Sequence, residues 1–246
     1  MLRPRPALHC EKARNLKKSG TLAVAEEDLA AARAEEKAAF LLRLRSDGIR
    51  DLDLLRALEK VPREMFVPHR FVDLARRDLA LPIGCGQTLT EPSLVARMIA
   101  ALGLTQDHRV LEIGTGSGYA TAILAEIAAQ VVSIERFQTL AIAARLRLER
   151  LGKENVEVIF ADGLSVPAAA GPFDRILIHA RLDELPAAFG AVLSQDGRIV
   201  MARPDPEVAW RQMLVELRRG PDGDLVETAL GASRLQALMP GTAQVL

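Results

Sequence analysis

The sequence predicts an α/β fold: a doubly wound, mostly parallel sheet with helices on both faces, preceded by a helical N-terminal extension. Two observations lead to this prediction. Short apolar runs rich in β-branched residues, typical of buried parallel strands, alternate with segments of helical character from residue 109 to residue 201. A glycine-rich turn, residues 114–118, joins the first of these strands to a helix, and open α/β sheets hold their ligands at such turns.

Composition narrows the class of protein. The chain has 246 residues, of which 49% are hydrophobic, enough for one large domain or for one domain plus an extension. The formal net charge of zero argues against a nucleic-acid partner. No apolar run reaches the roughly 18 residues needed to cross a membrane. Two distant cysteines and four unclustered histidines suggest neither a disulfide framework nor a metal site, so we expect a cytoplasmic protein without a metal.

The first part of the chain carries no chemical motif. Residues 1–20 are basic and predict a disordered tail, although an upstream start codon that was read through, or a transit peptide, would also leave a basic segment. Residues 21–45 have strong helix propensity and predict a long helix, packed on the main domain or on a second copy of the chain. We therefore expect a tail (1–20), a helical extension leading into the sheet (21–78) and the main domain (79–246).

The segment leading into the sheet should be partly helical. An amphipathic helix is expected at residues 49–58, and further helix within residues 69–78. Between them, Pro62 and Pro68 bracket a piece that we expect to be extended, with Phe66 packed into the core.

A polar loop precedes the next helix, which Pro92 should start and which should run to Ala101. Thr90 has two interpretations. It suits the N-cap of this helix and could have no other role. Alternatively, the loop belongs to an active site, because Gln87 and Thr88 beside two glycines provide more polar groups than a cap requires. We favour the second interpretation.

The glycine turn has an informative spacing. Gly114, Gly116 and Gly118 alternate, whereas a dinucleotide-binding turn requires its third small residue at position 119, which is Tyr119. This disfavours a nicotinamide enzyme. Two acids follow later apolar runs, Glu135 at about the distance at which an acid binds ribose hydroxyls, and Asp162 after the third run. Either acid alone could be a solvated strand end, but together with the turn they predict a nucleoside-shaped site.

The remaining elements follow from the same patterns. Helices are expected at residues 120–128, 137–151 and 183–193, and strands at residues 109–113, 131–134, 156–161, 173–179 and 198–201, the last after a turn at residues 196–197. Residues 208–218 and 224–236 should add a final antiparallel pair, although the composition of residues 213–217 fits a helix equally well.

Several of these segments resemble a known family. Residues 111–119, 133–136, 155–163 and 172–174 resemble the successive motifs of class I S-adenosylmethionine-dependent methyltransferases. Residues 82–92 and 61–68 are similar to those of the protein-L-isoaspartate O-methyltransferase family, and the former segment is the more specific signal. The resemblance covers roughly residues 48–205. It implies a Rossmann-like sheet of seven strands, with residues 79–246 as the methyltransferase domain.

The resemblance also implies an activity: transfer of a methyl group from S-adenosylmethionine to the free carboxylate of L-isoaspartyl residues in damaged proteins or peptides, a repair reaction. That carboxylate has an intrinsic pKa of about 3.5–4 and is ionised at neutral pH, so no general base is needed. The protein's contribution would be alignment and removal of water.

The resemblance assigns roles to individual residues. Thr90 stands where the family usually has a serine whose hydroxyl helps to hold the substrate carboxylate, and Glu135 would accept the ribose hydroxyls. The full cofactor-binding set implied for S-adenosylmethionine is Gln87, Thr88, Glu112, Gly114, Thr115, Gly116, Ser117, Gly118, Glu135, Arg136, Asp162 and Gly163.

The acceptor wall departs from the family pattern. Where the family usually has small residues after the fourth strand, this chain has the bulkier His179 and Arg181. Arg181 could contact a carboxylate or lie in solvent. Glu91 adds a negative charge beside Thr90. Two alternatives therefore stay open: a methyltransferase of the same fold with another acceptor, or a cofactor-binding protein without turnover that acts through its N-terminal helix.

Overall fold

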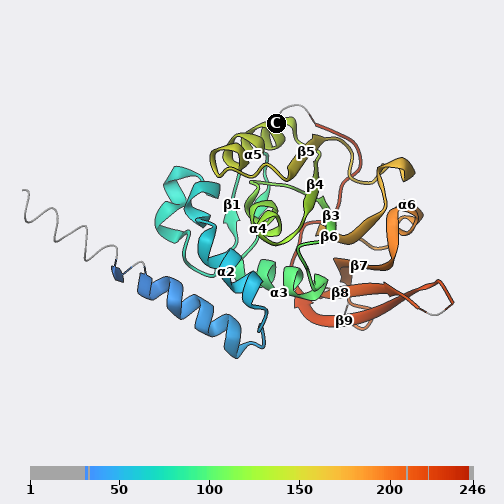
Figure 1. Ribbon diagram of the computed structural model, residues 1–246, viewed down its shortest axis with the longest axis horizontal. Helices are drawn as coiled ribbons and strands as arrows, with labels where there is room; N and C mark the ends of the chain where they lie inside the picture. The colour runs from blue at the N-terminus through green and yellow to red at the C-terminus, as the bar shows by residue number, and fades with distance from the viewer. Residues whose placement is uncertain (1–30, 33, 209, 221, 244–246) are drawn as a thin grey trace, which may run out of the picture. The chain divides into compact units, whose positions relative to one another are not determined.

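The computed structural model describes residues 31–243 except residues 33, 209 and 221 (Figure 1). The chain divides into two units, Met1–Ser46 and Asp47–Leu246. The described part of the first unit is helical as far as Ser46, within the predicted long helix. The predicted basic tail and the predicted start of this helix lie outside the described residues. The proposed boundary at residue 79 and the contact with a second copy stay predictions.

The second unit contains a seven-stranded sheet with the strand order β5-β4-β3-β6-β7-β8-β9. The strands β3 to β7 pair in parallel, and β8 and β9 add the antiparallel pair that the sequence predicts. The bounds are β3 Arg109–Ile113, β4 Gln130–Glu135, β5 Val156–Phe160, β6 Phe173–Arg181, β7 Leu193–Pro204, β8 Gln212–Arg219 and β9 Leu225–Ser233. This order and direction confirm the predicted doubly wound, mostly parallel fold.

Helices cover both faces of the sheet because the buried strands are apolar on both faces. Leu111 and Ile113 of β3 belong to a core cluster with Phe189 and Val192 of α6, whereas Val110, the residue before Leu111, points to the opposite face. There α3 packs on β6 and β7, and α4 and α5 pack on β4. The helices are α2 Leu52–Lys60, α3 Pro92–Leu102, α4 Tyr119–Ile127, α5 Gln138–Arg150 and α6 Ala187–Val192.

Two short strands, β1 Leu81–Pro82 and β2 Thr88–Leu89, pair antiparallel and shape the loop that precedes α3. Two 3₁₀ helices precede these strands in the chain, η1 Arg63–Phe66 and η2 His69–Leu74. A third, η3 Ala168–Ala170, precedes β6. In the described part of the chain, no helix combines the length and apolar character that a membrane crossing requires.

Two local predictions are wrong. The piece between Pro62 and Pro68 contains the 3₁₀ helix η1 and is not simply extended, although Phe66 is fully buried as predicted. Asp196 and Gly197 do not form a turn before the strand but lie inside β7. The register of β7 against β6 shifts at this point, so the strand absorbs these residues as an irregularity instead of ending.

Candidate active site

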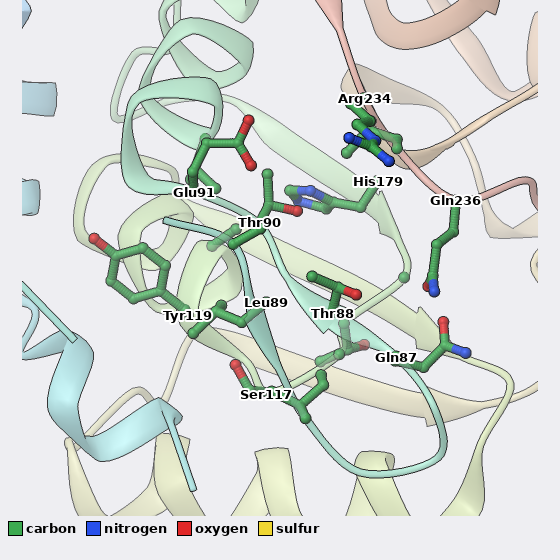
Figure 2. Close-up of a pocket in the computed structure, with 18 of the residues that line it drawn as sticks. Gln87, Thr88, Leu89, Thr90, Glu91, Ser117, Tyr119, His179, Arg234 and Gln236 are labelled. Carbon is green, nitrogen blue, oxygen red and sulfur yellow. The ribbon is translucent and has the colours of Figure 1, made fainter. Parts of the chain in front are cut away.

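The predicted site residues meet at a cavity of about 320 Å³ at the carboxyl ends of β3, β4 and β6 (Figure 2). One wall is the glycine turn, through residues 114–117. Another is the segment that we call the lid, residues 83–91, and the third comes from residues 234–236, which follow β9. A second cavity, of about 300 Å³, shares Gly114, Glu135 and His179 with the first. The two cavities therefore flank the same strand ends.

The glycine turn depends on backbone conformations that other residues adopt only with strain. Gly114, Gly116 and Gly118 have φ angles of +92°, +56° and +92°. A Cβ at Gly118 would also lie 3.3 Å from the Cβ of Ala144, so glycine allows α5 to pack closely. The alternating spacing seen in the sequence thus corresponds to a turn in which each glycine is required by its conformation.

Glu135 closes this turn from the neighbouring strand. It is only 4% exposed, and its Oε2 accepts a hydrogen bond of 2.8 Å from the backbone N–H of Gly116. Its Oε1 accepts one of 2.9 Å from Phe137. Burial raises the pKa of this carboxyl; the backbone N–H donors oppose this effect and the charge of Glu112 adds to it. Glu135 lines both cavities, so a ligand that spans them passes this carboxylate.

Glu112 lies behind the cavities and lines neither of them. It is fully buried, and its Oε2 accepts hydrogen bonds of 2.6 Å from the hydroxyls of Thr121 and Ser133. Its Oε1 lies 3.0 Å from Nε2 of His179. The hydroxyl of Ser133 also meets that of Thr115 at 2.5 Å. Through these contacts Glu112 holds His179 directly and Thr115 of the glycine turn by way of Ser133. A direct contact between Glu112 and a cofactor stays a prediction.

Thr90 is not the cap of α3, so the interpretation of this residue as a mere cap is wrong. The N-cap position is Glu91, and no side chain at that position bonds to the helix end. Pro92 occupies the first helical position, where it has no N–H of its own to bond. The N–H of Ser93 is instead bound by Oδ1 of Asp78 at 2.9 Å. Thr90 is therefore free to line the first cavity, which it does.

Arg63, from the segment that resembles the family, fixes the end of the lid. Its buried guanidinium donates hydrogen bonds to the carbonyls of Ala75 at 2.9 Å, Leu79 at 2.8 Å and Thr90 at 3.1 Å. Burial lowers the pKa of this guanidinium. It lies 5.7 Å from the centre of the Tyr119 ring. No sequence pattern indicates that this arginine positions Thr90, because the two residues are far apart along the chain.

The other predicted site residues fall into three groups. Those that line the first cavity are Gln87, Thr88, Gly114, Thr115, Gly116, Ser117, Glu135 and His179. Arg136 and Gly163 line the second cavity, together with Gln87, Gly114, Glu135 and His179. Gly118, Asp162 and Arg181 line neither of these cavities. Among them, Asp162 accepts backbone hydrogen bonds from Leu164 and Gly241, and Arg181 lies 3.4 Å from Asp183.

The C-terminal part of the chain adds residues that the sequence did not suggest. Gln212, Arg234 and Gln236 line the first cavity, and residues 237–239 line the second. Residues 236–243, which we call the strap, continue across the carboxyl edge of the sheet. The strap bonds to Arg181 at β6 through Gln236 and Leu238, to Arg136 after β4 through Ala243, and to Asp162 after β5 through Gly241. No local pattern could have shown these long-range contacts.

Comparisons with known proteins agree with the family resemblance seen in the sequence. The sequence model of the protein-L-isoaspartate(D-aspartate) O-methyltransferase family matches residues 35–239. The chain belongs to this family. A relative from Rhodopseudomonas palustris (strain BisA53), named protein-L-isoaspartate O-methyltransferase, is 49% identical over 86% of this chain and 97% of its own length. A relative of the same name from Xanthobacter autotrophicus is 47% identical over 86% of this chain and 95% of its own length.

Solved structures support the fold of this family member. A protein-L-isoaspartate O-methyltransferase aligns with a TM-score of 0.73 and 27% identity, over 82% of this chain and 65% of the solved one. A putative member from Plasmodium falciparum, solved in complex with S-adenosyl-L-homocysteine, aligns with a TM-score of 0.69 and 22% identity, over 82% and 97% of the two chains. The second likeness concerns the fold alone.

Proposed function

We propose that this chain transfers a methyl group from S-adenosylmethionine to the free carboxylate of L-isoaspartyl residues in damaged proteins or peptides. The observation that carries the proposal is one cavity in which the glycine turn and Glu135 face the lid with Thr90, in a chain whose family match spans residues 35–239. Relatives that are nearly half identical over almost their whole length carry the name of this activity. We further propose that the protein works in the cytoplasm on such substrates.

The residues present fit the cofactor. Glu135 faces both cavities and can accept ribose hydroxyls there while it holds the glycine turn. The hydroxyl of Ser117 is buried and has no hydrogen-bond partner among the described residues, so a polar ligand group could satisfy it. Gly163 and Arg136 would border the adenine in the second cavity. When bound, S-adenosylmethionine supplies an electrophilic methyl group on a cationic sulfur.

The protein's own task in this reaction is positioning. The acceptor carboxylate is ionised at neutral pH, so no side chain has to remove a proton. Thr90 offers a hydroxyl at the cavity, and Arg63 fixes its carbonyl, which keeps the lid in register with the glycine turn. His179 is held by Glu112 and points toward Thr90 (Figure 2). Removal of water from the reacting groups would add to the effect of this alignment.

The acceptor wall also favours one second candidate. His179, bonded to a buried carboxylate, narrows the cavity where the family usually has a small residue. A methyltransferase of the same fold with another acceptor would account for such a change. This candidate shares the cofactor and differs from the first only in the molecule that receives the methyl group.

One assay distinguishes these proposals. The protein is incubated with labelled S-adenosylmethionine and either an isoaspartyl peptide or the same peptide with a normal aspartyl residue. We expect the label to enter the isoaspartyl peptide alone, as a base-labile ester. Cofactor binding in calorimetry without transfer to either peptide would contradict the repair activity and favour the second candidate or a protein without turnover.

A further inference from the structure

Arg234 is a cationic side chain at the first cavity with no partner among the described residues. It follows β9 and lines the cavity together with Thr90 and Glu91. In Figure 2 Arg234 lies on the same side of the cavity as His179 and Gln236. Its side chain is exposed and makes no hydrogen bond or ion pair with any residue in the described part of the chain. A guanidinium in such a place is available for an anionic ligand.

The main chain around Arg234 is held in place while its side chain is not. The N–H of Leu235 donates to Oε1 of Gln212 at 2.8 Å, and Nε2 of Gln212 donates back to the carbonyl of Leu235 at 3.0 Å. Nε2 of Gln236 donates to the carbonyl of Gly86 in the lid at 3.2 Å. These bonds fix the base of the Arg234 side chain relative to the lid, so the guanidinium has a defined region to reach.

The other charges at this cavity repel an acidic substrate. Among the lining residues, Glu91 and Glu135 are acids, and Arg234 is the one arginine, with no lysine beside it. Glu135 is already bonded to the glycine turn. Glu91 makes no ion pair in the described part of the chain, and the guanidinium of Arg63, on which its charge acts, is buried and does not line the cavity. Arg234 is the group that can offset this repulsion.

We propose that Arg234 binds the isoaspartyl carboxylate that receives the methyl group, an inference that rests on the proposed function. The guanidinium donates charge-assisted hydrogen bonds to the carboxylate oxygens. Methyl transfer forms a bond from a carboxylate oxygen to the methyl carbon, while the carbon–sulfur bond breaks and its electron pair stays on sulfur. Both charges disappear and no proton moves. The ester is neutral and loses its ion pair with Arg234.

This loss has a kinetic consequence. The ion pair is strongest in the bound substrate and weakens as the carboxylate charge is consumed, so it stabilises the ground state more than the transition state. Arg234 therefore lowers KM for the peptide without raising kcat. It also lets the enzyme bind the charged substrate more tightly than the neutral methyl ester, which limits inhibition by product.

The test compares Arg234→Gln with the wild type on an isoaspartyl peptide whose neighbouring residues are uncharged. We expect KM for the peptide to rise about tenfold, as for the loss of one charge-assisted hydrogen bond, with kcat unchanged or slightly higher. Affinity for S-adenosylmethionine and the melting temperature should not change. Arg234→Lys should retain part of the effect, and added salt should shrink it in the wild type. Arg150→Gln, an exposed arginine of α5 that lines neither cavity, is the matched control.

Product inhibition gives a second measurement. The inhibition constant of the methyl-ester peptide should be the same for the wild type and for Arg234→Gln. An equal loss for ester and substrate would overturn the proposal, as would an unchanged KM in an active enzyme. An effect confined to peptides with an acidic neighbour would show that Arg234 reads the flanking residue instead. A wild type without activity on isoaspartyl peptides would refute the proposed function, and this inference with it.

Discussion

The two ends of the joined cavities differ in the kind of groups that form them. The cofactor end consists of backbone groups and buried carboxylates. Its glycine turn has positive φ angles, and Glu112 and Glu135 are at most 4% exposed and accept hydrogen bonds from neighbouring residues. At the acceptor end, Thr90, Glu91 and Arg234 come from the lid and from beyond β9, and the two charged side chains make no ion pair in the described residues. On the proposed function, backbone groups and buried carboxylates would hold the cofactor, whereas exposed side chains would hold the acceptor.

The most severe way to break the cofactor end is Glu135→Ala. It removes the carboxylate that holds Gly116 and Phe137 and that faces both cavities. We expect affinity for S-adenosylmethionine in calorimetry to fall about 100-fold, on the order of 2–3 kcal/mol for buried charge-assisted hydrogen bonds. Glu149→Ala, an exposed acid of α5, should leave affinity unchanged. If Glu135→Ala bound the cofactor normally, the carboxylate would have no place in the ribose site.

The packing of Gly163 against β3 should not tolerate a larger side chain. A Cβ at Gly163 would lie 2.5 Å from Cγ2 of Ile113, at the end of β3. We expect Gly163→Ala to lower the free energy of unfolding by about 2 kcal/mol, as for an overpacked core. Gly190→Ala is the control, because a Cβ there meets nothing within 4 Å and alanine favours the helix. Urea denaturation of both variants measures the difference, and equal midpoints would mean that Ile113 simply moves aside.

The contrast between the two ends also explains what the sequence could reveal. The cofactor end depends on local signals, glycines with special φ angles and acids after β-branched runs, so the strands, the turn and Glu135 were predictable. The acceptor end depends on long-range contacts. Arg63 reaches Thr90, and the strap reaches Arg136 and Asp162, through bonds that no local spacing encodes. The cofactor contacts of the individual site residues stay predictions.

Local rules also failed where the neighbouring structure overrode them. Thr90 has the right chemistry for an N-cap, but Glu91 holds that position and the side chain of Asp78 binds the N–H of Ser93. Asp196 and Gly197 are typical turn residues, yet β7 continues through them, because Leu193 before them and Arg198 after them both pair with β6.

At the acceptor end, Thr90→Val sharpens the comparison because it keeps the shape and removes only the hydroxyl. We expect kcat/KM on an isoaspartyl peptide to fall about tenfold, the typical cost of one lost hydrogen bond to a charged group. Cofactor affinity should stay within about twofold, because Glu135 and the glycine turn are untouched. Thr228→Val, at an exposed position of β9, is the control. An unaltered rate would leave Thr90 without a role in the reaction.

The smallest effect should come from pH. Burial raises the pKa of Glu135, so this carboxyl takes up its proton at a higher pH than a free one does. The ionised form is the better acceptor for ribose hydroxyls, so cofactor affinity should be full above the raised pKa and fall as the pH drops through it. For the protein without cofactor the sign is opposite: protonation relieves the burial of charge and favours folding as the pH falls. Calorimetry at pH 7 and pH 5 should show a loss of a few fold, and Glu135→Gln should abolish the difference.

The strap has a consequence for biosynthesis. The glycine turn and Glu135 leave the ribosome about a hundred residues before the segment that roofs the second cavity and bonds to Arg136 and Asp162. A nascent chain thus contains the strands and the glycine turn before it contains the strap that lines the second cavity. The second cavity receives its lining residues 236–239, and the sheet edge its bonds to the strap, only at this last stage of synthesis.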